Sequence, residues 1–316
     1  MDSVNISIRE SKHKGYESYI MESDDIKLEL VPELGAKIVS IVYKQSGKEW
    51  LLDPGKRSLE KPDPASRFVD CDMSGWDECF PTIDYCVIDQ EQPIALPDHG
   101  EVWSLAWHCE ADNESITCTV DGVCLPYKLS RRITFLSANQ IRMSYHVENK
   151  GTASLPFLWV PHPQFQVSEK TRILLPDSIK DMLCIYGGKK LSAGVKYDWT
   201  EHDLVLPEPV GDGRKFYAEG NVSEGWCGLQ GEETGDFLLM SVCPDAVPYL
   251  GIWIDEGLVN DRSAIALEPS IGYYDSLSRA LGNGTAHILK PAEAFEWSLD
   301  LFVGSGDGRA SINKLL

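Results

Sequence analysis

The period of the hydrophobic pattern constrains the fold of this chain most strongly. Apolar and polar residues alternate in short runs bounded by turn residues, as at 26–32 and 36–43, and a period of two is typical of strands with one buried face. Residues 101–149 form a meander of such runs, and a helical pattern is visible only near 275–281. We therefore predict an all-β fold of antiparallel sheets packed face to face.

The chain shows no division into smaller units. Further strand candidates lie at 156–167, 236–242, 249–255, 263–270 and 295–303, with neither an internal repeat nor a Ser/Gly linker between them. A chain of 316 residues can bury a sufficient core without disulfides or metals. We expect a single sandwich domain over 1–316 with its core at about residues 20–303.

The charge balance excludes several kinds of partner. Acidic residues outnumber basic ones by 49 to 29, giving a net charge of −20, which repels phosphate backbones and anionic lipid. The sequence has no run of signal-peptide type and no segment of about 20 apolar residues. We expect a cytoplasmic monomer or homodimer that binds neither nucleic acid nor membrane. The nine cysteines form no C-x-x-C pair, which predicts reduced, mostly buried thiols rather than a disulfide framework.

His162 is the first candidate site residue. It lies between Pro161 and Pro163, neither of which can donate to a sheet ladder, so regular pairing is expected to fail there. Phe157, Trp159 and Phe165 are close in sequence. An imidazole for proton transfer beside aromatic rings for the apolar face of a pyranose suits a sugar site. The alternative is a histidine that only packs at a strand end.

Glu268 is the second candidate. It ends an apolar strand, on the same face as Ala266, and Pro269 follows it. A carboxylate in an apolar setting has a raised pKa, which is more typical of a working base than of a surface acid. The alternative is that this face of the strand is solvated.

Two further segments carry polar groups suited to a sugar. At 97–103 Gly100 permits close backbone approach, and His99 can donate to a sugar oxygen. Residues 70–81 begin like a calcium loop, but Pro81 occupies the position of the bidentate glutamate, so calcium is not expected. The side chains at 76–78 offer instead an aromatic platform and hydroxyl acceptors, namely Trp76, Asp77 and Glu78.

Other chemistries lack support in the sequence. There is no H-E-x-x-H, no Walker loop and no G-x-S-x-G, and the glycine-rich run at 304–308 precedes no predicted helix. We expect neither a cofactor nor a metal.

Four segments together resemble the aldose 1-epimerase, or galactose mutarotase-like, family. They are PDHGEVW at 97–103, PHPQF at 161–165, ALEPSIGYYD at 266–275 and KPAEAFEWSLDLFV at 290–303, and the resemblance spans about residues 20–303. It implies an antiparallel supersandwich with a sugar groove on a concave face. It also implies that Glu268 is the base, His162 the acid and His99 a sugar contact, with Trp76 or Trp253 near the wall.

The family's sugar-binding arginine has Arg67 as its nearest counterpart, and its aspartate has none that we can place. The predicted reaction is the interconversion of α and β anomers. Glu268 takes the anomeric proton, His162 as imidazolium protonates the ring oxygen, the ring opens, C1 rotates, and closure reverses both transfers. Three alternatives stay open: a mutarotase of phosphorylated hexoses, a glycosidase pairing Asp77 or Glu78 with Glu268, and a non-catalytic sugar-binding protein.

Overall fold

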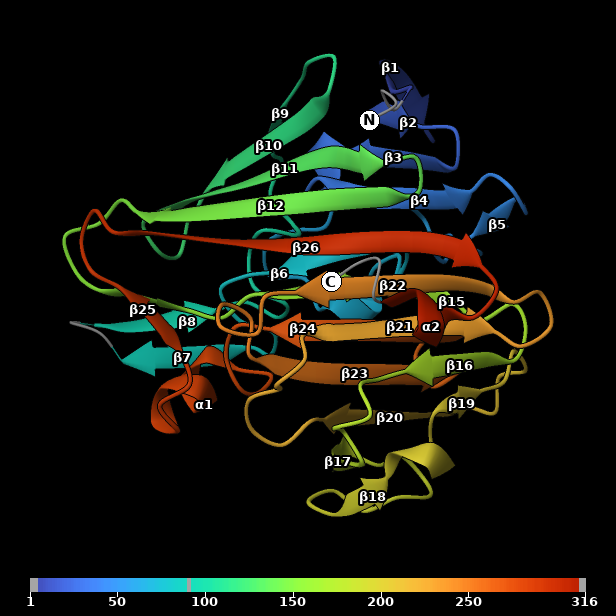
Figure 1. Cartoon of the computed structure of the whole chain (residues 1–316). Coiled ribbons are helices and arrows are strands. Elements are labelled where there is room, and N and C mark those ends of the chain that lie inside the picture. Colours follow the sequence, from blue (N-terminus) through green and yellow to red (C-terminus); the bar gives the residue numbers. More distant parts are fainter. Residues whose placement is uncertain (1–4, 90–91, 313–316) are drawn as a thin grey trace.

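The structure, a computed structural model, describes residues 5–89 and 92–312. It consists almost entirely of strands joined in antiparallel ladders (Figure 1), which confirms the predicted all-β fold. The described residues form three large sheets and two small ones. The described residues include no helix that is long and apolar enough to cross a bilayer.

The first large sheet contains the N-terminal strands and one strand from the middle of the chain. Its order is β1-β2-β3-β4-β6-β14, with β5 paired to β4. The bounds are β1 Ser7–His13, β2 Tyr16–Glu22, β3 Ile26–Val31, β4 Lys37–Tyr43, β5 Lys48–Glu49, β6 Trp76–Cys79 and β14 Val160–Pro163.

The second sheet has nine strands in the order β19-β16-β21-β22-β26-β12-β11-β10-β9. The predicted meander forms its β9-to-β12 edge. The bounds are β9 His108–Ala111, β10 Ser115–Asp121, β11 Tyr127–Ser137, β12 Gln140–Asn149, β16 Thr171–Leu174, β19 Leu204–Val205, β21 Trp226–Gly231, β22 Asp236–Val242 and β26 Ala294–Ser305.

The third sheet has six strands in the order β15-β24-β23-β20-β17-β18. Its bounds are β15 Phe165–Gln166, β17 Asp181–Tyr186, β18 Lys196–Asp198, β20 Asp212–Tyr217, β23 Tyr249–Glu256 and β24 Ser263–Ser270.

Two hairpin-sized sheets and a few short helices complete the fold. The small sheets pair β7 Cys86–Asp89 with β8 Pro93–Leu96, and β13 Leu155–Phe157 with β25 His287–Leu289. Helix α1, Leu277–Gly282, forms where the helical pattern was found, capped by the Ser276 hydroxyl, which accepts from the Arg279 amide. Helix α2, Gly308–Ser311, was not predicted because one turn is too short to show a period. Short 3₁₀ turns occur at Pro32–Leu34, Phe68–Asp70 and Trp199–Glu201.

One large apolar cluster joins the three sheets. It includes Ile41 from β4, Met143 from β12 and Ile265 from β24, all fully buried. The curved strands of the nine-stranded sheet pass across the other two sheets (Figure 1). Burial of this apolar surface supplies most of the free energy that stabilises the fold.

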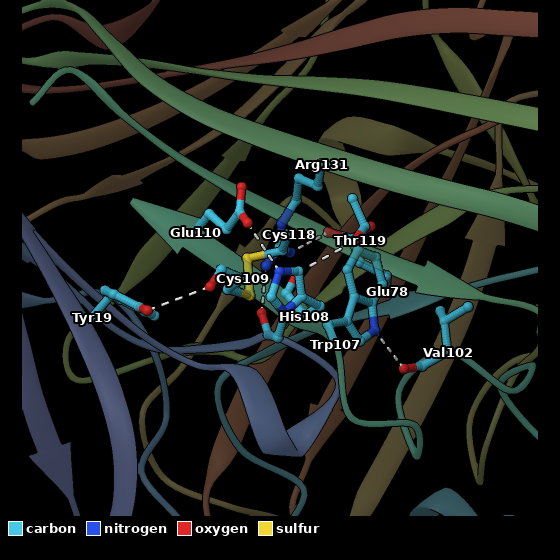
Figure 2. Close-up of a disulfide and its surroundings, with 11 residues drawn as sticks. Tyr19, Glu78, Val102, Trp107, His108, Cys109, Glu110, Cys118, Thr119 and Arg131 are labelled. Carbon is cyan, nitrogen blue, oxygen red and sulfur yellow. Dashed lines mark hydrogen bonds and ion pairs between the residues drawn. A yellow bond between two sulfur atoms is a disulfide. The ribbon is translucent and has the colours of Figure 1, made fainter. Parts of the chain in front are cut away.

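A buried ion pair also links two sheets. Arg131 on β11 donates from Nη1 to Glu78 Oε1 on β6 at 2.8 Å and from Nη2 to the Ala36 carbonyl, and both side chains are inaccessible to solvent. Tyr145 Oη and Trp159 Nε1 donate to the same carboxylate at 2.9 and 2.7 Å. Figure 2 shows Arg131 reaching toward Glu78 across the sandwich.

The expectation of reduced thiols is wrong for one pair of cysteines. Cys109 on β9 and Cys118 on β10 form a disulfide (Figure 2). The two residues are directly opposed in an antiparallel ladder, with Cα atoms 4.0 Å apart, and the sequence did not reveal this register. The other seven cysteines are free thiols, of which Cys79, Cys86, Cys184 and Cys227 are buried.

Candidate active site

His162 and Glu268 meet at the junction of two sheets. His162 lies on β14 of the seven-stranded sheet and Glu268 on β24 of the six-stranded sheet. His162 Nδ1 is 3.1 Å from Glu268 Oε1, and the two residues are 5% and 0% exposed. The structure thus brings together two residues that are 106 positions apart in the chain.

The prolines around His162 do not abolish strand pairing, contrary to our expectation. Residues Val160 to Pro163 pair with Cys79 to Trp76 of β6, so that His162 faces Asp77 in the ladder. Pairing persists because β14 is the edge of its sheet and needs ladder bonds on one side only. The prolines instead divide the predicted strand 156–167 into three short strands that join three different sheets. The ladder of β24 likewise continues through Pro269, which is opposite Leu250.

Lys215 completes the contacts of Glu268. This lysine lies on β20, and its Nζ is 2.7 Å from Glu268 Oε2 and 3.0 Å from Asp275 Oδ1. Tyr217, two residues further on the same strand, donates its hydroxyl to Asp275 Oδ1 at 2.8 Å. One ammonium therefore bridges two carboxylates, with one of its three donors left over.

The pKa of Glu268 is opposite to our expectation. Burial alone would raise it, but the Lys215 ammonium and the contact with His162 lower the pKa of Glu268 from 4.5 to about 2. The carboxylate is buried, as the apolar strand around it indicated. The sequence pattern did not reveal the cation, because Lys215 is far away in the chain.

The surroundings of His162 favour its neutral form. Burial lowers its pKa below 6.5, although the Glu268 carboxylate opposes the shift. Since Glu268 is ionised, Nδ1 of His162 is the donor to it, and Nε2 accepts from Gln164 Nε2 at 3.0 Å. The lowered pKa of His162 disfavours the imidazolium form that protonates the ring oxygen in the predicted reaction. Gln164 Oε1 has no hydrogen-bond partner among the described residues, so a turn of this amide would provide an acceptor for a protonated Nε2.

His99 is the third member of the cluster. Its ring stacks on Phe68 with centroids 4.2 Å apart and lies 5.0 Å from the ring of His162. Nδ1 is 3.1 Å from Asp98 Oδ1. The following residue, Gly100, has a φ of +73°, and a Cβ there would lie 2.1 Å from the Phe80 carbonyl oxygen. Only glycine fits this approach, and the tight turn carries His99 toward His162.

These groups border a cleft of about 350 Å³. A cleft of this size is at the lower end of the roughly 300–1,000 Å³ usual for small-molecule sites, which suits a single sugar ring. Glu268 is closed off from it by Lys215 and His162. The lining residues are Phe68, Val69, Met73, Ile83, Asp84, His99, His162, Ile185, Tyr186, Lys215, Trp253, Val259 and Asp275.

Comparison with known proteins identifies the architecture. No family model matches the sequence, and no curated protein matches it. Among solved structures, an aldose 1-epimerase candidate from Klebsiella pneumoniae aligns with a TM-score of 0.76 and 13% identity, over 100% of this chain and 88% of that one. A galactose mutarotase-like protein from Clostridium acetobutylicum aligns with a TM-score of 0.69 and 15% identity, over 96% and 99%.

The chain has the galactose mutarotase-like fold. The Slr1438 protein from Synechocystis sp. PCC 6803 aligns similarly, with a TM-score of 0.73 and 17% identity over 96% of this chain and 100% of that one. The resemblance noted in the sequence is thus confirmed for the fold.

Within this galactose mutarotase-like fold, Trp253 lines the cleft with His99 and His162, whereas Trp76 does not. Trp76 is fully buried and packs edge to face on Phe165, with centroids 5.9 Å apart. Arg67 is outside the cleft as well, with 72% of its side chain exposed and Asp70 as its ion-pair partner at 3.9 Å.

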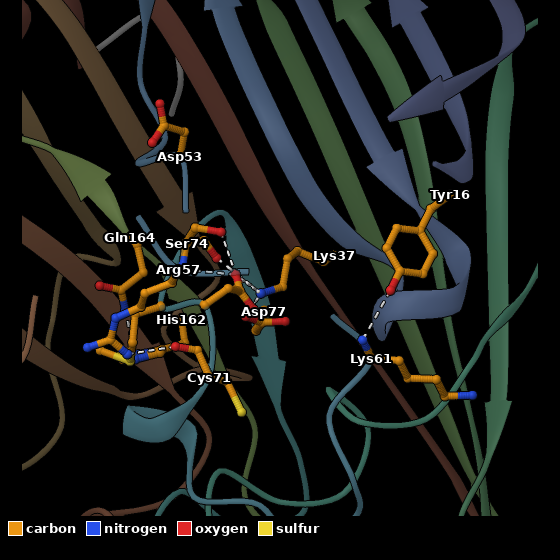
Figure 3. Close-up of polar contacts among 12 residues, drawn as sticks. Tyr16, Lys37, Asp53, Arg57, Lys61, Cys71, Ser74, Asp77, His162 and Gln164 are labelled. Atoms are coloured by element: carbon orange, nitrogen blue, oxygen red, sulfur yellow. Dashed lines mark hydrogen bonds and ion pairs between the residues drawn. The ribbon is translucent and has the colours of Figure 1, made fainter. Parts of the chain in front are cut away.

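The two acids beside Trp76 do not line the cleft either. Glu78 is the partner of Arg131 described above. Asp77 is 1% exposed and forms an ion pair with Lys37 at 3.0 Å, which Figure 3 shows together with His162 and Gln164. Burial raises the pKa of Asp77 to about 7 although Lys37 opposes the shift. The run 76–78 looked like a rim because it is polar, yet its two carboxylates pair with buried cations.

Three groups could also meet at a metal ion. Potential ligand atoms of Cys79, His99 and His162 all lie within 4.8 Å of one another. However, burial and the nearby Glu268 carboxylate raise the pKa of the Cys79 thiol well above 9, and Nε2 of His162 already contacts Gln164. The present contacts favour acid and base chemistry over metal binding.

Sequence reasoning missed Lys215, Asp275 and Gln164. Asp275 closes the segment ALEPSIGYYD and Gln164 lies within PHPQF, so both belonged to motifs that were noticed for other residues. Lys215 belonged to none. Its only signal is a cation between residues that alternate as in a strand, and that pattern is equally typical of a solvated face.

Proposed function

We propose that this protein is an aldose 1-epimerase, which interconverts the α and β anomers of a neutral sugar by acid and base catalysis. The observation that supports this most strongly is the contact of His162 with Glu268 at 3.1 Å beside a cleft of sugar size. An ionised carboxylate and an imidazole in contact are the two groups that ring opening requires.

In the proposed reaction Glu268 removes the proton of the anomeric hydroxyl, and the imidazolium of His162 protonates the ring oxygen. The ring C–O bond breaks, C1 becomes an aldehyde and rotates, and the reverse transfers close the ring on the other face. Each transfer contributes about 10²–10⁴ in rate. His99 and Trp253, which line the cleft, would hold the sugar through a hydrogen bond and a ring face.

Glu268 must first be uncovered, because Lys215 holds its Oε2 in the free protein. Lys215 already has a second partner, Asp275, at 3.0 Å, so it can release Glu268 without losing its ion pair. Loss of the ammonium would raise the pKa of Glu268 and make the carboxylate a stronger base. In this account the anomeric hydroxyl takes the place of Lys215 at Oε2.

The site favours a neutral sugar over a phosphorylated one. Recognition of phosphate uses free guanidinium or ammonium groups, but the cation lining the cleft, Lys215, is bridged by Glu268 and Asp275. Asp84 and Asp275 add negative charge. A glycosidase is disfavoured as well, because Asp77 and Glu78 are buried in other ion pairs and do not line the cleft with His162.

NMR exchange spectroscopy of α and β anomers over a panel of free and phosphorylated aldoses tests the proposal. We expect catalysed exchange of at least one neutral aldose and none of the phosphorylated ones. Glu268→Gln and His162→Asn should each reduce the rate about 10²-fold or more while changing sugar affinity by less than about tenfold. His108→Asn, at an exposed histidine on β9, is the matched control and should exchange anomers like the wild type. If a sugar binds and is not exchanged, the protein is a sugar-binding protein on this fold.

A further inference from the structure

Gln164 is a buried glutamine whose side chain contacts His162. Its Nε2 is 3.0 Å from His162 Nε2 (Figure 3), and the residue is inaccessible to solvent. Its other polar atom, Oε1, has no hydrogen-bond partner among the described residues. Buried polar atoms in native proteins are nearly always paired, so this amide calls for an explanation other than packing.

The backbone of Gln164 is held on both sides, which leaves the amide free to turn in place. Residue 164 joins β14 to β15. Its N–H donates to the Gly75 carbonyl, and its carbonyl accepts from the Leu52 N–H, both at 2.7 Å. The last side-chain torsion of a glutamine is broad and roughly two-fold, and a half turn exchanges Oε1 with the similarly sized Nε2. The amide therefore has two orientations toward His162, which differ in the atom presented.

The proton that charges His162 arrives at the nitrogen facing this amide. Nδ1 is 3.1 Å from Oε1 of the ionised Glu268 and donates to it. A neutral imidazole carries one proton, so Nε2 accepts from the Gln164 amide, and the imidazolium forms by protonation of Nε2. In the present orientation two N–H donors would then face each other across 3.0 Å. A half turn of the amide would replace this repulsion by a hydrogen bond to Gln164 Oε1.

The two orientations of the amide do not stabilise the two forms of His162 equally. A hydrogen bond from a charged donor is roughly twice as strong as one between neutral groups. The present orientation offers the neutral ring a bond of the weaker kind, and the turned orientation offers the imidazolium one of the stronger kind. The amide therefore favours the charged form and opposes burial, which lowers the pKa of His162.

Other titratable groups near His162 come from several parts of the fold and are not altered when Gln164 is replaced. They are Glu268 on β24, Lys215 on β20, Asp77 and Cys79 on β6, and His99 with its partner Asp98 in the turn after β8. Their influence is common to the wild type and to variants of Gln164. A difference between these proteins therefore reports residue 164.

We propose that Gln164 is a positioning residue, which donates to neutral His162 and turns to accept from its imidazolium, so that the acid of the reaction stays available in a buried site. The proton taken up at Nε2 comes from water. His162 gives a proton to the ring oxygen as the ring C–O bond breaks and regains it on closure, so the turn requires no further reactant. The effect on rate rests on the proposed epimerase function, whereas the effect on His162 itself does not.

Nitrogen-detected NMR of the histidine rings tests the inference in the wild type. The signals of His162 are those absent from the His162→Asn variant. We expect the neutral ring to carry its proton on Nδ1, with Nε2 unprotonated. A neutral ring protonated at Nε2 would overturn the inference, because the amide would then already be the acceptor.

Two variants of Gln164 should move the pKa of His162 in opposite directions. Gln164→Met keeps the length of the side chain but removes both polar atoms, so the pKa of His162 and the basic limb of kcat/KM for anomer exchange should fall by about 0.5–1 pH unit. Gln164→Glu supplies an acceptor without a donor and should raise both by about one pH unit or more. Gln166→Met is the matched control, because the Gln166 amide donates to the Glu49 carbonyl. It should move neither the pKa nor the limb.

Two results separate this inference from the epimerase proposal. If the pKa of His162 moves as expected but no sugar is exchanged, Gln164 positions the proton on His162 and the epimerase function is wrong. If a sugar is exchanged and the pKa of His162 is the same in the wild type, Gln164→Met and Gln164→Glu, the inference is overturned while the epimerase function stands. A lower exchange rate in Gln164→Met without a moved limb would show a structural role only and would overturn the inference too.

Discussion

Replacement of Lys215 by methionine should move the acid limb of the pH profile of anomer exchange. Lys215 lies between Glu268 Oε2 and Asp275 Oδ1, at 2.7 and 3.0 Å. Methionine retains much of the aliphatic volume but removes the ammonium. Glu268 would then keep His162 as its remaining polar partner, while staying fully buried.

The size of the expected pH shift follows from the opposing influences on the pKa of Glu268. In the wild type the pKa of this carboxyl is about 2, against an ordinary 4.5, because Lys215 and His162 outweigh burial. Burial by itself can raise the pKa of a carboxyl by up to about 3–5, so without the ammonium the pKa should rise past 4.5. A rise of the pKa from about 2 to the ordinary 4.5 is a shift of about 2.5 pH units.

The assay is kcat/KM for anomer exchange between about pH 4 and 8, since this parameter reports groups of the free enzyme. A base must be ionised, so activity is lost as the pH falls through the pKa of Glu268. The wild type should show no loss from Glu268 in this range, whereas Lys215→Met should lose activity progressively below about pH 5–6. Lys215→Arg keeps the positive charge and should retain the wild-type limb.

A separate control distinguishes this effect from simple destabilisation. Lys48 forms a comparably buried ion pair with Glu169, at 2.6 Å and outside the cleft. Breaking a buried pair costs roughly 3–5 kcal/mol of stability, so both Lys48→Met and Lys215→Met should lower the melting temperature. Only Lys215→Met should also move the acid limb of the pH profile of anomer exchange. The reasoning is refuted if the limb of a folded Lys215→Met protein stays at the wild-type pH.

Three further predictions concern other buried charges. Glu268→Gln removes the carboxylate that favours the imidazolium, so the pKa of His162 should fall further below 6.5, as followed by nitrogen-detected NMR of the ring; a rise would contradict the assigned contact. Arg131→Met leaves Glu78 buried without its cation and should cost roughly 3–5 kcal/mol in denaturant unfolding, whereas Arg132→Met, on the exposed side of β11, should cost less than about 0.5 kcal/mol. Burial would raise the pKa of Glu169, but Lys48 and Thr234 lower it to about 2, so its stabilising effect is present above pH 4.5 and is lost as the pH falls toward 2. Glu169→Gln should therefore flatten the acid dependence of the unfolding free energy over that interval, and an unchanged slope would argue against the ion pair.

The sequence was sufficient for the fold because the signal for strands is local. Alternation along residues 127–149 predicts β11 and β12 without knowledge of their partners, and both form. What alternation does not contain is the register between strands. The opposition of Cys109 and Cys118 depends on register alone, and so it was missed.

In the site, too, local patterns were predicted from the sequence and properties of the assembled sheets were not. His162 and Glu268 stood out because prolines flank them in strand-like segments, and the structure places them in contact. Their protonation states could not be predicted, because these depend on Lys215 and on depth of burial, which are properties of the assembled sheets. At 76–78 the local pattern instead led to a wrong prediction of position, because polar residues were taken to line the sugar site. They lie on an interior strand, and buried partners on β4 and β11 account for the two acids.

The most direct test of the account is anomer exchange of a sugar that is shown by titration to bind the protein. The wild type and the Glu268→Gln/His162→Asn double variant are compared at equal concentration and equal saturation. We predict that the wild type accelerates exchange over the double variant by about 10²-fold or more, with the rate declining as the pH rises through the pKa of His162, which is below 6.5. Equal rates for the two proteins, with the sugar bound to both, would contradict the epimerase mechanism.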